Sequence, residues 1–413
     1  ANVNIYFIYI CNHTDQETRV MEDDIFEELR RILEESINSS IERERTTFDK
    51  VIARYNPEGI ILFGAGGLGQ RTLSGLRRLK QLPLCFSDSN PERWGTRIEE
   101  FEILSPQEAV KTYPRALFIV TIWSDQIGHP LDEIQNTLNA ISGVGVIPFG
   151  FLYWKYPEIF LPYYSIHLPH RTLEQAKEIL QAYFFWEDDF SKREYVNQIK
   201  WRLTFNHRIL SKPFGKQYFP EDIIKLRQNE TFIDIGAFSG DTLQYFLSMQ
   251  KLNFKKYYAF EPDPVNFQKM HSFINDLGPE YQRKIIPVQK AVSHSAEMVK
   301  FNSEGTSKSS VNTNGNIEVQ AISLDSYLVR EKPTYITMDA EGFEPFIIEG
   351  AKELIKAYSP VLAVSAYHAF SHLWEIPGRI HLLSKNYKFF LRPHCEACWD
   401  LVCYAVPKTG RAD

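Results

Sequence analysis

Two acidic residues and a histidine, each placed just after an apolar segment, are the side chains in this sequence best suited to chemistry. Asp339 and Glu341 lie in the stretch DAEGFE, directly after residues 335–338. Two carboxylates on one side of a strand end can divide the roles of proton acceptor and positioning group, or can coordinate a metal. His368 follows residues 361–366, and its imidazole could accept a proton near neutral pH. We predict these three residues as catalytic and assign no metal ligand. The alternatives are a helix cap for one acid and a packed role for the histidine.

A glycine-containing turn within TFIDIGAFSGDT, residues 231–242, indicates a ligand site. Its first residues are short and apolar, as in a buried parallel strand, and Gly236 and Gly240 then allow the backbone to turn tightly beside a ligand. Asp234 places a carboxylate where a pyrophosphate would be repelled. The turn therefore favours a ligand with a cationic amino-acid end over a dinucleotide.

A second strand-end acid indicates what the rest of that ligand is. Glu261 lies in YYAFEPDPVNF, residues 257–267, after the next apolar strand. An acid at this distance from a glycine turn lies where a ribose presents its hydroxyl groups. Asp263 and Pro264 then have the residue types that begin a helix. The two segments together predict a pocket for a nucleoside that carries an amino acid.

Residues of about 215 to 407 resemble the FkbM family of S-adenosylmethionine-dependent methyltransferases. The resemblance rests on six stretches in order: QYFP at 217–220, FIDIGAFSGDT, FEPDPVNF, VQKAVS at 288–293, ISLDSY at 322–327 and ITMDAEGFEPFIIEGA at 336–351. It implies S-adenosylmethionine as the cofactor, with the methionine end beside Asp234, Gly236 and Gly240, the ribose on Glu261 and the adenine near Ala291 and Val292. The complete predicted cofactor site is Asp234, Gly236, Ala237, Gly240, Thr242, Glu261, Pro262, Ala291 and Val292.

Another strand, turn and helix pattern begins at Gly59. The apolar strand IILF precedes the turn GAGGLG at 64–69, a leucine-containing helix follows, and the next strand ends at Asp88. This order predicts a small Rossmann-like domain. Glycines also serve tight packing without a ligand, so a site for a nucleotide or sugar nucleotide and a purely structural role both remain open.

The predicted fold class is α/β, with a Rossmann-like methyltransferase sheet that closes in a C-terminal antiparallel hairpin, and a second, N-terminal Rossmann-like domain. The predicted organisation is an N-terminal strand and helical segment at 1–56, the Rossmann-like domain at 57–150, an aromatic and helical connector at 151–215 and the methyltransferase domain at 216–413. The expected strands of the second sheet are 231–234, 257–261, 285–292, 335–339 and 361–366, with the hairpin at 388–392 and 401–406. Residues 22–55 are expected to form a cover helix broken near Asn38–Ser40, and 150–170 an irregular connection.

The composition of the sequence argues against several classes of binding partner. The net charge is −6 and the 413 residues contain no long basic run, which argues against nucleic acid as a partner. The apolar residues 3–10 lack a basic segment and a cleavage site, and no apolar run reaches about 18 residues, so we expect no membrane partner and a cytoplasmic protein. Five cysteines fit a reducing compartment, and Cys395 with Cys398 forms a lone CxxC that we interpret as structural.

We therefore expect a methyltransferase that moves a methyl group to a hydroxyl of a sugar or other small metabolite. The acceptor could also be a sugar nucleotide, and an oligomer is left open. The alternative is a non-catalytic or bifunctional protein that binds sugar nucleotide or NAD. Asp234 and Glu261 favour S-adenosylmethionine. His372 is expected at the surface.

Overall fold

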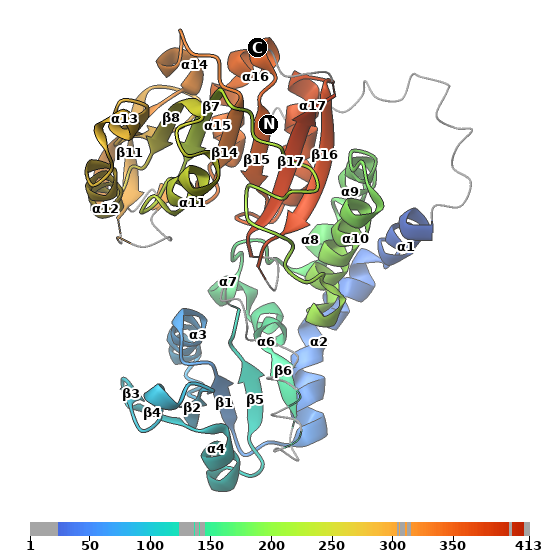
Figure 1. Cartoon of the computed structure of the whole chain (residues 1–413). Coiled ribbons are helices and arrows are strands. Elements are labelled where there is room, and N and C mark those ends of the chain that lie inside the picture. The colour runs from blue at the N-terminus through green and yellow to red at the C-terminus, as the bar shows by residue number, and fades with distance from the viewer. Residues whose placement is uncertain are drawn as a thin grey trace.

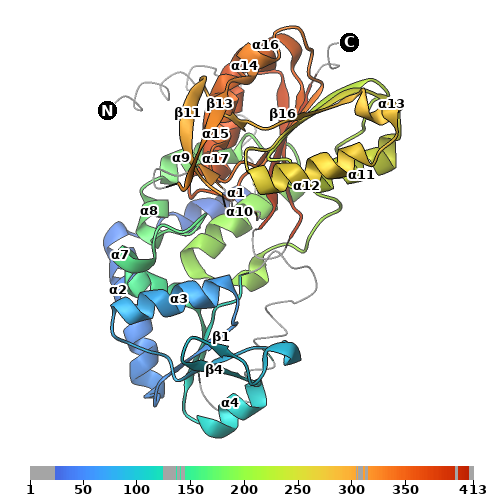
Figure 2. The same ribbon diagram turned by 90° about the vertical axis from the view of Figure 1, so that its left-hand side faces the viewer.

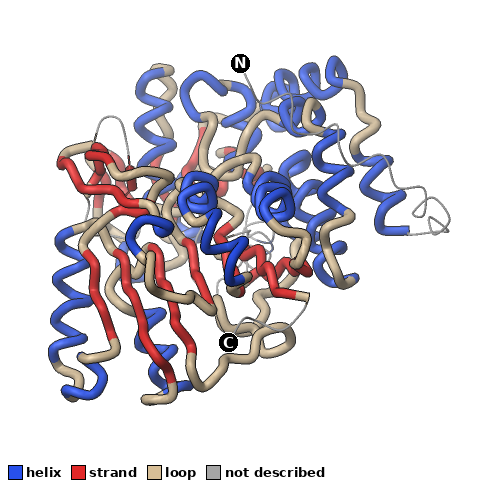
Figure 3. Tube along the Cα trace, turned by 90° about the horizontal axis from the view of Figure 1, so that it is seen from above, coloured by secondary structure: helices blue, strands red, loops and turns tan. Residues whose placement is uncertain are grey.

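Two mainly parallel sheets, each covered by helices, form the protein (Figure 1). The computed structural model describes residues 24–123, 136, 140, 145–303, 305, 310–311, 315–395 and 399–408. Figure 3, seen from above, shows helices on both sides of the strands. The α/β class predicted from the sequence is confirmed.

The N-terminal sheet has the strand order β3-β4-β2-β1-β5-β6. All neighbours pair in parallel except β3, which pairs antiparallel to β4. The glycine turn after β1 leads into α3, as the strand, turn and helix pattern predicted. The elements of this part are α2 (Ile37–Tyr55), β1 (Ile60–Phe63), α3 (Gly67–Arg78), β2 (Cys85–Ser87), β3 (Arg97–Ile98), β4 (Phe101–Leu104), α4 (Pro106–Thr112), β5 (Leu117–Val120) and β6 (Val146–Pro148).

The C-terminal sheet has seven strands in the order β16-β17-β15-β14-β7-β8-β9. Five strands are parallel, and β17 and β16 close the sheet as an antiparallel pair. The elements of this sheet and its helices are β7 (Glu230–Ile235), α11 (Asp241–Gln250), β8 (Phe254–Phe260), α12 (Pro264–Asn275), α13 (Pro279–Gln282), β9 (Ile285–Val288), α14 (Leu324–Tyr327), β14 (Tyr335–Met338), α15 (Glu344–Gly350), α16 (Lys352–Tyr358), β15 (Val361–Ser365), α17 (His372–Leu383), β16 (Tyr387–Pro393) and β17 (Leu401–Pro407).

The predicted single strand at 285–292 is wrong in one respect. The main-sheet strand β9 ends at Val288, and Ala291 and Val292 form the short strand β10 of a separate four-stranded sheet. A bond from the Lys290 amide to the Val288 carbonyl turns the chain between the two. The small sheet contains β10 (Ala291–Val292), β11 (Glu297–Asn302), β12 (Ser310–Val311) and β13 (Ile317–Ile322).

Alternation along β7 divides the C-terminal domain into two apolar cores. Phe232 packs with Phe246 of α11 and Met270 of α12 on one face. Ile233 and Ile235 face the opposite core, to which α15, α16 and α17 contribute. Figure 2 shows the two groups of helices on opposite sides of the strands. Because successive side chains of a strand point to opposite faces, a fully buried strand such as β7 has apolar side chains on both faces.

Helices from the N-terminal half complete the second core. Leu29 of α1 (Asp24–Ile32) is fully buried in the same cluster as the strands β7, β14 and β15. The same cluster contains Ile179 of α9 (Ala176–Tyr183) and Tyr195 of α10 (Asp189–Thr204), whereas Trp201 at the far end of α10 packs in the N-terminal core. Helix α10 therefore joins the two cores.

Two expectations for the first half need correction. The break between α1 and α2 lies at residues 33–36, before Asn38, and Ser36 caps α2 by accepting a hydrogen bond from the Ser39 amide. The segment 150–170 contains helices that bury aromatic rings in the N-terminal core, and only Tyr156 and residues 161–168 within it lie outside a helix. Its helices are α6 (Phe149–Lys155), α7 (Pro157–Phe160) and the start of α8 (Pro169–Leu173).

Replacement of Leu29 tests the contribution of α1 to the C-terminal core. Leu29→Ala leaves a cavity at a fully buried position and should lower the free energy of unfolding by about 2–5 kcal/mol. Leu82→Ala is the control, because Leu82 is 50% exposed and should change stability by about 0.5 kcal/mol or less. Urea denaturation of both full-length variants measures the difference. Equal stability of the two would show that α1 does not hold this core.

Candidate functional site

The turn after β7 lies directly against the end of β14. Gly236 has φ +82°, and a Cβ atom on it would lie 1.8 Å from the carbonyl oxygen of Asp339. Gly240 has φ +88° at the start of α11, also in the region that favours glycine. The glycine turn and the acidic strand end, predicted from separate parts of the sequence, are therefore in contact.

Glu261 is held at the end of β8 by two backbone amides. One carboxylate oxygen accepts from the Phe238 amide at 2.8 Å and the other from the Asp263 amide at 2.8 Å. Only 5% of the residue is exposed. Burial raises the pKa of this carboxyl to about 8, against the lowering effect of the two amides. Glu261 thus lies beside the glycine turn, as its prediction as a ribose ligand requires.

Asp234 is more deeply placed than a direct ligand of a cationic group would be. Its carboxylate accepts hydrogen bonds from Tyr257 at 2.7 Å and from Thr337 at 2.8 Å, and 2% of the residue is exposed. Burial raises the pKa of Asp234 to about 7, opposed by these two hydrogen bonds. The residue links β7 to both neighbouring strands below the turn.

The other residues of the predicted cofactor site lie in two places. Some lie at or near the glycine turn, and the others lie in the small sheet. Ala237 is buried in the turn, and Thr242 is partly buried in the first turn of α11. Pro262 follows Glu261 and is partly buried. Ala291 and Val292 are buried in β10, 5% and 4% exposed. Their roles stay predictions.

His368 and three carboxylates form a compact cluster beyond β14 and β15. The Nε2 atom of His368 lies 3.2 Å from Asp339 Oδ1 and 3.7 Å from Glu341 Oε1. Its Nδ1 atom lies 2.7 Å from Glu344 Oε1. The side chains of His368 and Glu344 are fully buried, whereas Asp339 is 25% and Glu341 18% exposed. The structure brings the three predicted catalytic residues together.

The residues of this cluster differ in pKa, because each is surrounded by different charges. Burial alone would lower the pKa of His368, but Glu344, Glu341 and Asp339 raise it to about 10. Burial would raise the pKa of Glu344, yet His368 and His372 lower it to about 2. Burial raises the pKa of Glu341 to about 7, although His368 opposes this. His368 is therefore already protonated near neutral pH, and Glu341 is the group in the range suited to accept a proton.

Sequence reasoning missed three contributors to the cluster. Glu344 stands in the same DAEGFE stretch and binds both the Ala340 amide and His368. Tyr218, within the QYFP stretch, donates to Asp339 Oδ2 at 2.5 Å. Tyr164 contributes a hydrogen bond to Glu341. Both stretches had been recognised, but only the folded chain brings residue 218 to residue 339.

The expectation that His372 lies at the surface is wrong. His372 is 3% exposed, and its Nδ1 atom lies 3.4 Å from Glu344 Oε2. It occupies the first position of α17, which packs on α15 and so turns this residue inward. The CxxC motif can be described only in part, since Cys398 lies outside the described residues. The Cys395 thiol donates to Asp400 at 3.1 Å.

Aromatic rings connect the cluster to the N-terminal domain. Trp123, three residues after β5, lies 4.7 Å from Trp399 between ring centroids. Tyr164 lies 5.0 Å from Trp399 and 6.5 Å from His368 by the same measure. Arg71 of α3 stacks on Tyr163, 4.4 Å from its ring centroid. The carboxyl-terminal ends of strands in both sheets thus approach one aromatic junction, formed by Trp123, Tyr163, Tyr164 and Trp399.

The N-terminal glycine turn repeats the arrangement around Glu261. Asp88, after β2, accepts from the Ala65 amide at 2.8 Å and from the Asn90 amide at 2.9 Å. Gly64 has φ +112°, and a Cβ on Gly66 would meet no atom within 4 Å. The pattern of a strand-end acid bonded to the glycine turn and to the residue two positions on therefore occurs in both sheets.

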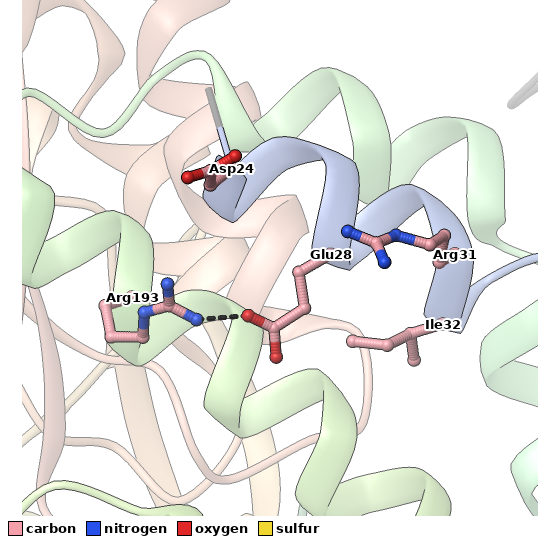
Figure 4. A pocket seen from close by; sticks show the side chains of 5 residues that line it. All are labelled: Asp24, Glu28, Arg31, Ile32 and Arg193. Atoms are coloured by element: carbon pink, nitrogen blue, oxygen red, sulfur yellow. Dashed lines mark hydrogen bonds and ion pairs between the residues drawn. The ribbon is translucent and has the colours of Figure 1, made fainter. Parts of the chain in front are cut away.

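A hollow of about 510 Å³ lies between α1 and α10, away from the cluster around His368 (Figure 4). It is lined by Asp24, Glu28, Arg31, Ile32 and Arg193. Glu28 pairs there with Arg193 and, at 2.7 Å, with Lys200. None of the lining residues lies at a strand end, and the charged groups of Glu28 and Arg193 satisfy each other, so this hollow is no part of the candidate site.

Membrane insertion finds no support in the helices. In the part of the chain that the structure describes, every helix is too short or too polar to cross a bilayer.

The raised pKa of Glu261 predicts a pH-dependent stability. Because the folded-state pKa of about 8 exceeds the ordinary value of 4.5, the contribution of Glu261 to the free energy of unfolding is complete below about pH 4.5 and is lost as the pH rises through 8. Glutamine cannot ionise. We therefore expect wild type to lose stability relative to Glu261→Gln between pH 5 and 9, measured by urea denaturation without cofactor. A difference that stays constant with pH would contradict a buried, proton-retaining Glu261.

Comparison with solved structures identifies the fold. The crystal structure of methyltransferase FkbM from Methylobacillus flagellatus KT is 20% identical, with 90% of this chain and 99% of that chain covered and a TM-score of 0.70. UDP-D-quinovosamine 4-dehydrogenase from Vibrio fischeri is 20% identical over 22% of this chain and 79% of that chain, but its TM-score of 0.18 is too low to show a shared fold. No curated protein gives a significant sequence match.

A family model matches a large part of the C-terminal sheet. The methyltransferase FkbM domain matches residues 234–391, from Asp234 of β7 to β16 and across the cluster around His368. The match and the shared fold agree with the resemblance found in the sequence. By this family model, residues 234–391 of the chain match the methyltransferase FkbM domain.

Proposed function

We propose that this methyltransferase moves a methyl group from S-adenosylmethionine to a hydroxyl group of a sugar or other small metabolite. The observation that carries the proposal is the contact between Gly236 and the backbone of Asp339. It sets a cofactor-type glycine turn directly beside a cluster of proton-accepting groups. A methyl donor on the turn and an acceptor on the cluster would therefore meet.

The cofactor half of the proposal rests on Glu261 and its surroundings. A carboxylate fixed by two amides at a strand end is a suitable acceptor for two ribose hydroxyls. The Phe238 amide belongs to the glycine turn itself, so a ribose on Glu261 extends toward Gly236. From Gly236 the methionine end would reach the carboxyl-terminal end of β14, where Asp339 lies.

The acceptor half rests on the charges of the cluster. Methyl transfer from a sulfonium is an in-line displacement, for which alignment supplies a large part of the rate. A hydroxyl also benefits from a base within about 3 Å whose pKa is close to the operating pH. Glu341, with a pKa of about 7, fits that role, and Asp339 is placed to orient the hydroxyl. The His368 imidazolium offsets the charge of both.

The aromatic junction supports a small, ring-shaped acceptor. The ring of Tyr164 lies 6.5 Å from that of His368 and 5.0 Å from that of Trp399 between centroids, and the ring of Tyr163 lies 5.0 Å from that of Tyr164. Sites for small molecules combine apolar and aromatic walls with a few polar groups that fix orientation. Rings beside two carboxylates match a sugar, which has apolar faces and hydroxyl edges.

Replacement of Glu261 tests the cofactor assignment. Glu261→Ala removes the acceptor of two ribose hydroxyls and should weaken S-adenosylmethionine binding by about 1.5–3 kcal/mol, because two buried hydrogen bonds are lost. Isothermal titration calorimetry measures the affinity. Asp88→Ala is a matched control, because Asp88 accepts the same pair of amides in the other sheet. A larger loss from Asp88→Ala than from Glu261→Ala would place the cofactor on the N-terminal turn instead.

Replacement of Glu341 or Asp339 tests the acceptor side. Glu341→Gln and Asp339→Asn keep the shape of each side chain and should lower turnover by about 10²- to 10⁴-fold with cofactor affinity nearly unchanged. A screen of sugar and small-metabolite hydroxyls with radiolabelled methyl donor measures turnover. Glu349→Gln, on the exposed surface of α15, is the control. Wild-type turnover in both variants would make the two carboxylates structural.

A further inference from the structure

The Nε2 atom of His368 has an unusual environment. The imidazole side chain is fully buried, and Nε2 forms no hydrogen bond with any residue that the structure describes. The opposite nitrogen, Nδ1, lies 2.7 Å from an oxygen of Glu344, a buried carboxylate that also accepts a hydrogen bond from the Ala340 amide. An ionised carboxylate only accepts, so Nδ1 carries a proton and Nε2 is the atom left for another partner.

Two carboxylate oxygens face that atom at distances typical of shared metal ligands. Asp339 Oδ1 lies 3.2 Å and Glu341 Oε1 3.7 Å from Nε2. Bonds from zinc to nitrogen or oxygen are about 2.0–2.2 Å long, so two ligands of one ion lie up to roughly 4.3 Å apart. Ligand-type atoms of Asp339, Glu344 and His368 also lie within 4.8 Å of one another. An ion beside Nε2 would therefore be within reach of each of these two oxygens.

Each of the three facing groups is oriented by a second residue. Glu344 holds Nδ1 of His368, and Tyr218 donates to Oδ2 of Asp339, which leaves Oδ1 toward the imidazole. Tyr164 hydrogen-bonds Glu341. Metal sites in proteins have this feature, because outer partners fix the tautomer of the histidine and the direction of the carboxylates.

The charge of the cluster favours a cation. Three carboxylates surround His368, and in the described part of the chain their ion pairs are formed with His368 and His372 alone. Burial strengthens repulsion among like charges. A divalent ion would offset more of this charge than the single proton on Nε2.

We propose that Asp339 Oδ1, Glu341 Oε1 and His368 Nε2 bind one divalent transition-metal ion. Imidazole nitrogen together with carboxylate oxygen suits ions such as Mn²⁺ and Zn²⁺, with water or the acceptor hydroxyl in the remaining positions. Tyr218, Tyr164 and Glu344 are positioning residues for the three ligands.

The chemical role of the ion rests on the proposed function. A bound cation lowers the pKa of a coordinated hydroxyl. That hydroxyl gives its proton to Oε2 of Glu341, the carboxylate oxygen not bound to the ion, and Glu341 releases the proton to solvent. The hydroxyl oxygen forms the bond to the methyl carbon, and the carbon–sulfur bond breaks with both electrons left on sulfur. The products are the methyl ether, neutral S-adenosylhomocysteine and one proton.

Electron paramagnetic resonance of Mn²⁺ added to the EDTA-treated, dialysed full-length protein tests the site without any methyl donor. Wild type should bind one Mn²⁺ per chain, and echo modulation should show a coupled nitrogen nucleus. His368→Gln should abolish the nitrogen coupling, and both His368→Gln and Asp339→Asn should weaken binding at least tenfold. Tyr218→Phe should weaken it about 10- to 100-fold, as loss of an outer partner does.

His170→Gln is the matched control, because His170 also pairs with a buried carboxylate, 2.8 Å from Glu44. It should bind Mn²⁺ like wild type. Absence of stoichiometric binding to wild type, or of nitrogen coupling in its complex, overturns the proposal even if a variant fails to fold. Full methyl transfer in excess EDTA would also overturn it while the proposed function stands, whereas Mn²⁺ binding without any transfer would leave the metal site and remove the function.

Discussion

The close approach of two strand ends is the constraint on which the site depends. At Gly236 the chain of β7 passes so near the Asp339 carbonyl that any side chain would overlap it, and the backbone has φ +82°. Only glycine satisfies both conditions without strain. Because β7 and β14 are paired in parallel, this contact holds the glycine turn and the DAEGFE segment together at the carboxyl-terminal ends of the strands. Ligands of open α/β sheets bind beyond these carboxyl-terminal strand ends.

Much of this architecture could be predicted from local signals. The buried strands of the second sheet are short apolar runs bounded by turn residues, and Asp263 with Pro264 marks a helix start that the structure retains. The closing hairpin followed from a connection too short for a crossover helix. Errors occurred where tertiary contacts decide. Helices α6 and α7 form where their rings are buried in the N-terminal core, and β9 ends early because the next residues join another sheet.

The candidate site was predictable in its components more than in its electrostatics. Asp339, Glu341 and His368 were expected from strand-end positions, but the charge of His368 depends also on Glu344, whose carboxylate binds both the Ala340 amide and the imidazole. Tyr218 lies 121 positions before Asp339 in the chain, and no spacing rule links the two. For the same reason a histidine assigned as a base from its ordinary pKa becomes an imidazolium once buried among acids.

The aromatic junction gives the protein a built-in optical reporter. Trp123 belongs to the N-terminal domain and Trp399 to the hairpin loop of the other, and their rings lie 4.7 Å apart. Rotation of one domain away from the other would separate these indoles and expose Trp123, which is 8% accessible, to water. Indole emission shifts to longer wavelength in a polar environment, so the fluorescence colour of the unlabelled chain would follow such an opening in real time. A ligand could then be added to the protein while the wavelength of tryptophan emission records the movement of the two domains relative to each other.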